Sequence, residues 1–93
     1  MNKFIKLDSG DMLASEVVST EGGDVKLKNP QMIWPTETGI TLVKYNMFGK
    51  SDTITIDETD ILFSDELTDE VNEHYLKVVS KVDIPVKSNI ITE

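Results

Sequence analysis

Apolar and polar residues alternate along much of the segment 4–63, and this period of two predicts five or six short antiparallel strands. The clearest run begins at Asp24, where Val25 and Leu27 fall on one face and the lysines beside them on the other. Glycines stand in polar segments between such runs, as tight turns between antiparallel strands require. The pattern therefore predicts a mainly β fold.

Two prolines bracket the next apolar run, and after a polar turn the chain returns as a strand that ends near Tyr45. This arrangement predicts an elongated hairpin at about residues 31–45, because proline is accepted at strand ends and edges. Trp34 lies on this hairpin. An exposed Trp34 would anchor a partner, but a large aromatic residue in a small domain more often belongs to the core, and we expect it there.

The spacing of apolar residues lengthens to three or four after Phe63, which predicts an amphipathic helix over residues 64–82. Ser64 has the side chain of a helix N-cap, and the acidic residues after it suit the positive end of the helix dipole. The apolar stripe consists of Leu67, Val71, Tyr75, Val78 and Val79. Pro85 should prevent continuation, so residues 83–93 are expected to form a tail that is extended along the body or disordered.

The length of 93 residues allows one domain, in which residues 1–63 form the strand-rich part. A core of this size gains stability when an edge or a face is buried in an oligomer, and we expect self-assembly. No apolar run approaches the roughly 18 residues of a membrane span. Because the chain contains no cysteine, it has no disulfide framework, and a cytoplasmic location is expected.

Acidic residues outnumber basic ones by 17 to 9, and the excess lies in one segment. No lysine interrupts the chain between Asp52 and Glu73, whereas the rest of the chain is close to neutral. Nucleic-acid binding draws most of its affinity from cations, and all nine bases are lysines, without the forked guanidinium of arginine. This balance disfavours tight nonspecific DNA binding and makes the acidic helix a candidate surface for a protein partner.

Over residues 4–63 the chain resembles the Sm and Sm-like family. The first motif of the family is similar to Phe4–Gly10 followed by Val17-Val18 and Val25–Leu27, and its second motif is similar in place to Ile54–Ile61. More closely, the chain resembles small Sm-like proteins of marine tailed phages, with the same Lys-Asn-Pro after the third strand and a helix after the barrel. A phage-encoded chain would act in the cytoplasm of the host cell.

The resemblance implies a small, strongly bent antiparallel Sm-like barrel of five or six strands with a C-terminal α-helix, assembled as a homo-oligomeric ring. Family members bind uridine-rich RNA through an Asn after the second turn and a basic residue in the second motif. In this chain the corresponding positions hold Asp24, Asp57 and Glu58. At intermediate dielectric a carboxylate repels a close phosphate by up to a few kcal/mol before screening, so we expect the usual RNA pocket not to function.

Ring formation is less affected by these changes, because it depends on backbone edges. The strands on either side of Asp57 would leave unpaired N–H and C=O groups that a neighbouring copy can satisfy head to tail. The expected interface residues, which would also contribute to the core, are Ile54, Ile56, Ile61 and Phe63. The alternative is a monomer whose free edge is covered by the C-terminal tail.

The stretch from Lys44 to Lys50 is the candidate site for RNA or single-stranded nucleic acid, because lysines flank aromatic residues there without an acid. Single-strand binding uses exposed aromatic rings that stack on bases beside cations. The candidate residues are Lys44, Tyr45, Phe48 and Lys50. Alternatively, Tyr45 and Phe48 are core or interface residues and the lysines are solvated.

The sequence offers little for catalysis. His74 is the only histidine and has no nucleophile at a known spacing. Asp57, Glu58 and Asp60 would bind a divalent cation if symmetry gathered them around a ring axis. Since the spacing of a calcium loop is missing, a solvated acidic loop is expected instead. We therefore expect no enzyme, no metal site and no cofactor.

The leading hypothesis from sequence is a noncatalytic Sm-like ring subunit that binds RNA or single-stranded nucleic acid. The alternative is a structural or adaptor ring that binds protein partners and has lost RNA binding. The reversed charge at the positions of both motifs favours the alternative, whereas the lysines and aromatic residues after residue 43 favour the first hypothesis.

Overall fold

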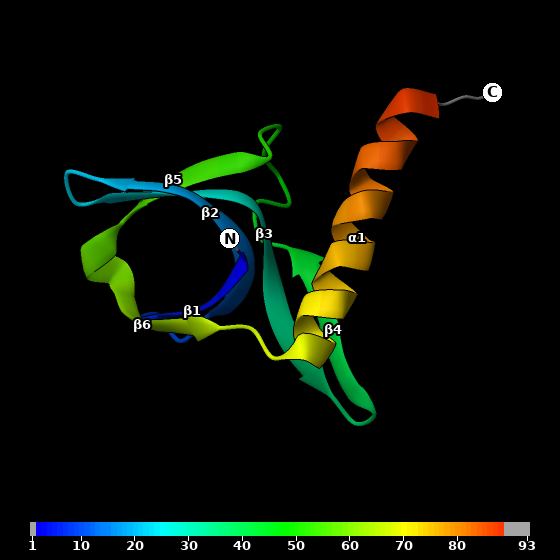
Figure 1. The fold of residues 1–93 in the computed structure, drawn as a ribbon, viewed down its shortest axis with the longest axis horizontal. Coiled ribbons are helices and arrows are strands. Elements are labelled where there is room, and N and C mark those ends of the chain that lie inside the picture. Colours follow the sequence, from blue (N-terminus) through cyan, green and yellow to red (C-terminus); the bar gives the residue numbers. More distant parts are fainter. Residues whose placement is uncertain (1, 89–93) are drawn as a thin grey trace.

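The computed structural model describes residues 2–88, with side chains described up to residue 80. This part of the chain forms six strands, a short 3-10 helix and one α-helix, and Figure 1 shows the arrangement of the strands and the α-helix. In chain order they are β1 (Asn2–Leu7), β2 (Met12–Glu21), β3 (Asp24–Thr36), β4 (Gly39–Lys44), β5 (Thr53–Asp57), η1 (Glu58–Asp60), β6 (Ile61–Glu66) and α1 (Asp69–Ser88).

The strands form one antiparallel sheet in the order β4-β3-β2-β1-β6, with β5 paired to β3. The long strand β3 has β2 along one edge and two partners along the other. β5 pairs with its first half, from Asp24 to Lys28, and β4 with its second half, from Gln31 to Thr36. The predicted mainly β class with antiparallel strands and a C-terminal helix is confirmed.

The sheet is open between β5 and β6. These strands end the path that runs through β1, β2 and β3, and η1 connects them along the chain (Figure 1). Within residues 2–88 no ladder joins β5 to β6, so the expected strongly bent barrel is not confirmed. The elongated hairpin expected at about residues 31–45 corresponds to β3 and β4, which are joined by a turn after Thr36.

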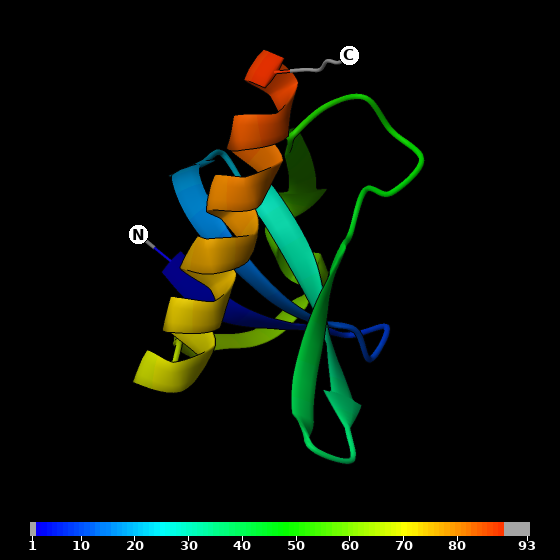
Figure 2. The ribbon, with the colours of Figure 1, turned by 90° about the vertical axis from the view of Figure 1, so that its right-hand side faces the viewer.

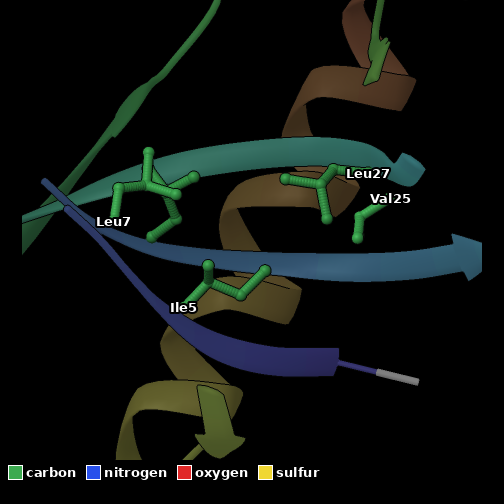
Figure 3. Close-up of a cluster of buried hydrophobic side chains, with 5 residues drawn as sticks. Ile5, Leu7, Val25 and Leu27 are labelled. Atoms are coloured by element: carbon green, nitrogen blue, oxygen red, sulfur yellow. The ribbon is translucent and has the colours of Figure 1, made fainter. Parts of the chain in front are cut away.

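The main core consists of side chains from three neighbouring strands. Figure 3 shows Ile5 and Leu7 of β1 directed toward Val25 and Leu27 of β3, and Leu13 of β2 completes the buried cluster. The alternation that predicted strands also selects these residues, because every second side chain of a strand points to the same face. Half-buried residues from β5 and β6 pack against the cluster.

The helix begins at Asp69, five residues later than predicted. Ser64 is not its N-cap, because Ser64 lies in β6 and pairs with Ile5 of β1. Thr68 has the capping role: its hydroxyl oxygen accepts a hydrogen bond from the Val71 amide at 3.3 Å. The boundary between strands and helix therefore lies near residue 67, because the ladder with β1 holds the chain extended up to Glu66.

The helix also ends later than predicted, at Ser88 instead of residue 82. Pro85 lies inside α1, although proline lacks the N–H that bonds to the carbonyl one turn earlier. The residues from 83 to 88 are thus helical and not extended. The rest of the expected tail, 89–93, lies outside the described residues.

Candidate functional site

The segment 45–52, between β4 and β5, is a hydrogen-bonded loop that projects from the body of the molecule (Figure 2). The Gly49 amide donates to the carbonyl of Asn46 at 3.1 Å, and the Asn46 side-chain amide donates to the carbonyl of Ser51 at 3.1 Å. At the tip the Phe48 side chain is 99% exposed. A loop held by internal bonds loses little entropy when it binds, so it suits an anchor residue.

Two of the four nucleic-acid candidates are engaged inside the protein. The Lys44 ammonium donates to the Gly49 carbonyl at 3.3 Å, and the Tyr45 ring packs against the core cluster. Burial, and then Asp11 and Asp60, raise the pKa of Tyr45 above its ordinary value. The stretch that lacks acids in sequence therefore has acids beside it in space. Phe48 and Lys50 are the two candidates whose side chains remain exposed.

The acidic residues Asp24, Asp57 and Glu58 lie close to one another. Asp24 and Asp57 are cross-strand partners in the β3–β5 ladder, and the Glu58 amide donates to the carbonyl of Gly23 at 2.8 Å. The Asp57 carboxylate also caps η1, since it accepts the Thr59 amide at 3.0 Å and the Thr59 hydroxyl at 2.9 Å. These bonds favour the ionised form and lower the pKa of Asp57.

The predicted interface residues divide into two groups. Ile54, Ile56 and Ile61 are half-buried and pack against the core. Phe63 is 52% exposed and contacts Phe4, with ring centroids 5.8 Å apart. The outer edges of β5 and β6 have no partner strand in the described part of the chain.

Sequence reasoning missed an apolar groove between the sheet and the start of α1. It has a volume of about 320 Å³ and the following apolar lining: Phe4, Ile33, Phe63, Leu67 and Val71. Asp65 and Glu66 lie at its side. The sequence does hold one indication of the groove, because Phe4 and Phe63 are apolar residues on the strand face that does not point into the core. That they lie next to each other follows only from the register of β1 with β6.

Trp34 was expected in the core and is 53% exposed. The β2–β3 ladder ends at Met32, so the second half of β3 extends past the core, and Trp34 pairs only with Thr41 of β4. The hairpin therefore presents Trp34 on its surface.

Tyr75 fastens α1 to the sheet and is 2% exposed. Its hydroxyl oxygen accepts the Glu16 amide at 3.1 Å and lies 3.2 and 3.0 Å from the carbonyl oxygens of Lys28 and Asn29. Burial raises the pKa of Tyr75 to about 12. Because all these partners of the hydroxyl are backbone groups, the role of Tyr75 is structural: it holds α1 against β2 and β3.

The remaining chemical candidates do not form a site in the described residues. His74 lies on α1 beside Glu70, Glu73 and Lys77 in a shallow hollow. Among residues with described positions, no group of three or more His, Cys, Asp or Glu side chains is arranged to hold a metal ion. In the same part of the chain, no helix has the length and apolarity needed to cross a bilayer.

A comparison with protein-family models finds no matching family, and a comparison with curated proteins finds no matching relative.

Proposed function

We propose that the chain is a noncatalytic Sm-like subunit that assembles with copies of itself, head to tail, through β5 and β6. The observation that carries this proposal is the pair of free edges at the two ends of the sheet path. β5 has a partner only along the edge facing β3, and β6 only along the edge facing β1, in residues 2–88. The unpaired N–H and C=O groups of such edges are a template for pairing with another chain.

The strand order supports the resemblance as well as the assembly. The segment that resembles the second family motif runs from β5 through η1 to the start of β6. It therefore includes both strands with free edges and the short helix that connects them. Pairing of β5 in one copy with β6 in the next is a heterologous contact, because the two copies use different surfaces. Repeated contacts of this kind close into a ring when the rotation between neighbouring copies is a simple fraction of a full turn. We also propose that the sheet of each copy bends into the barrel that the resemblance implies.

We propose that the assembly binds a protein partner and acts as a structural or adaptor ring. Asp24 and Asp57 face each other across the β3–β5 ladder, and Glu58 follows directly, where the family binds RNA. Acidic side chains also continue from Asp65 along β6 into the first turn of α1. Gathered carboxylates repel a phosphate chain and attract basic segments of proteins.

Single-stranded nucleic acid is the second candidate ligand, and the exposed ring of Phe48 beside the exposed Lys50 favours it. A labelled oligo-uridine and a labelled oligo-adenine, followed by fluorescence anisotropy at low and high salt, test it. Lys50→Glu and Phe48→Ala should each weaken binding, while Lys77→Glu on the exposed part of α1 should not. Absence of binding at low salt rejects this candidate.

Hydrogen exchange tests the assembly, with the mass measured first. Light scattering should give a defined multiple of 10.4 kDa. On going from dilute to concentrated protein, amide protection should rise in β5 and β6. The free edge of β4 is the internal control and should not change. A species of 10.4 kDa at every concentration, or protection that rises in β4 instead, rejects the proposal.

A further inference from the structure

We propose that the loop 45–52 of one copy docks into the groove of the next copy, with Phe48 inserted between Phe63 and Val71. The inference rests on the head-to-tail pairing of β5 with β6 proposed above, and it assigns the contact that fixes the order of the copies. The loop offers an exposed aromatic ring and a lysine, and the groove offers an apolar lining beside two carboxylates.

The direction of the strands brings these surfaces together. In an antiparallel pair, the first residues of one strand lie beside the last residues of the other. The loop 45–52 leads directly into Thr53, where β5 begins, and the groove lies where β6 ends at Glu66. Phe48 stands five positions before Thr53, a reach of at most about 17 Å. The tip of the loop therefore meets the groove of the neighbour.

A single copy does not make this contact. In Figure 2 the loop projects on the side of the molecule away from the start of α1, where the groove lies. The Phe48 ring is 99% exposed within its own copy, although an aromatic ring of this size gains stability when it is buried. Both facts indicate that the binding partner of Phe48 belongs to another molecule.

The groove accepts a phenyl ring. An apolar cavity of about 150 Å³ is large enough for benzene, and this groove has about 320 Å³. Its lining combines the tilted aromatic pair of Phe4 and Phe63 with the aliphatic side chains of Leu67 and Val71. Aromatic residues that fill such pockets contribute most of the affinity of many protein interfaces.

The charges around the two surfaces are opposite. Lys50 follows Phe48 on the loop, and no acidic residue lies between Lys44 and Lys50. Asp65 and Glu66 lie beside the groove. Because the chain as a whole carries a net charge of −8, copies repel one another except where a basic surface faces an acidic one. Lys50 is the one base of the loop, and its exposed side chain fits the acidic side of the groove. Asp52 stands at the other end of the loop, where its carboxylate accepts a hydrogen bond from the Thr53 hydroxyl.

Self-association of variants tests the docking, measured by sedimentation equilibrium of the full chain. Phe48→Ala should weaken it at least about thirtyfold, as expected for a buried aromatic anchor. Trp34→Ala is the matched control, because Trp34 is also a large exposed aromatic but lies on the hairpin, outside the groove. Lys50→Glu should weaken association a few fold, and Lys50→Glu combined with Asp65→Lys should restore it.

Disulfide trapping tests the same contact by geometry, since the chain has no cysteine of its own. A mixture of Met47→Cys and Glu66→Cys should form a cross-linked dimer quickly. A mixture of Met47→Cys and Thr38→Cys, at the turn of the hairpin, should not. Equal rates in the two mixtures, or unchanged association of Phe48→Ala, overturn the docking.

The outcomes separate this inference from the function on which it rests. Concentration-dependent protection of β5 and β6 with unchanged association of Phe48→Ala means that the edges pair without the loop. If Phe48→Ala assembles normally but loses oligo-uridine, the loop contacts nucleic acid and the docking is wrong. A wild-type chain that stays at 10.4 kDa removes both proposals.

Discussion

Replacing Tyr75 by Phe should destabilise the protein by about 1–3 kcal/mol, because it removes one hydroxyl from the junction of α1 with the sheet. The ladder between β2 and β3 is irregular at this point: Ala14 pairs with Gln31, but Glu16 pairs with Lys28. One residue of β2 thus faces two residues of β3, and regular ladder bonds are interrupted. The Tyr75 hydroxyl replaces them by accepting the Glu16 amide and donating to a carbonyl of β3.

The size of the loss follows from what remains after the substitution. Tyr75→Phe keeps the buried ring, so the packing of α1 is preserved, but the Glu16 amide loses its acceptor. An unpaired buried donor costs about 1–3 kcal/mol. For a domain of this length, each kcal/mol lowers the melting temperature by about 4–8 °C. Tyr45→Phe is the matched control and should cost less, because the Tyr45 side chain is only half-buried.

Urea denaturation followed by far-ultraviolet circular dichroism gives the free energy of unfolding of each variant. The pH dependence adds a second measurement. The pKa of Tyr75 is raised from 10.0 to about 12, so between these values the unfolded chain loses its proton while the folded chain keeps it. The contribution of Tyr75 to stability is constant below pH 10 and falls above it. The loss is about 2.3 kcal/mol at pH 12, where half of the folded tyrosine is ionised, and it approaches about 2.7 kcal/mol at higher pH, at about 1.36 kcal/mol per pKa unit.

The difference between wild type and Tyr75→Phe isolates this effect, because every other residue is the same in the two proteins. The advantage of the wild type should therefore shrink as the pH rises from 10 to 12. This role of the Tyr75 hydroxyl is refuted if the two proteins differ by less than about 0.5 kcal/mol at neutral pH, which is the usual effect of a neutral surface change. It is also refuted if their difference does not change above pH 10.

Two further substitutions test the local structure of the site's scaffold. Thr68→Ala should destabilise α1 by about 1 kcal/mol through loss of its N-cap, whereas Ser64→Ala should have little effect; equal losses in urea denaturation would contradict the observed helix start. The pKa of Asp57 is lowered in the folded state, so the wild type should lose stability as the pH falls below 3.8 and this carboxylate is protonated. Asp57→Asn has no carboxylate at this position and should lose less stability over the same pH range. Acid titration of the urea midpoint measures this, and an identical acid response of the two proteins would contradict it.

The strands could be predicted because their pattern is local. Val25 and Leu27 alternate with lysines, and the structure buries both. Ser64 shows where local signals are insufficient: it resembles a helix cap, but hydrogen bonds with β1 retain it in a strand. Trp34 shows the same limit for burial, since its exposure depends on how far β3 extends past β2. In both cases strand pairing, and not local propensity or hydrophobic pattern, determines where the residue lies.

The groove could not be predicted because its walls come from distant parts of the chain. Phe4 and Phe63 meet only through the register of β1 with β6, and Val71 joins them only if the helix starts after Thr68. A helix that began at Ser64 would place Leu67 and Val71 elsewhere. The loop was more accessible to prediction, because lysines and aromatic residues without acids are visible in sequence. Its internal hydrogen bonds and the engagement of Lys44 were not.

The response to salt distinguishes the proposed electrostatic contact of Lys50 from a steric one. Charges interact over about 10 Å at 0.1 M salt and over about 3 Å at 1 M. If Lys50 acts by facing the acidic side of the groove, the defect of Lys50→Glu in self-association should be large at low salt and small at 1 M. The defect of Phe48→Ala should persist at both, because burial of an apolar ring does not depend on screening. A Lys50→Glu defect that survives 1 M salt would mean that the side chain acts through packing, and the charge complementarity of loop and groove would be wrong.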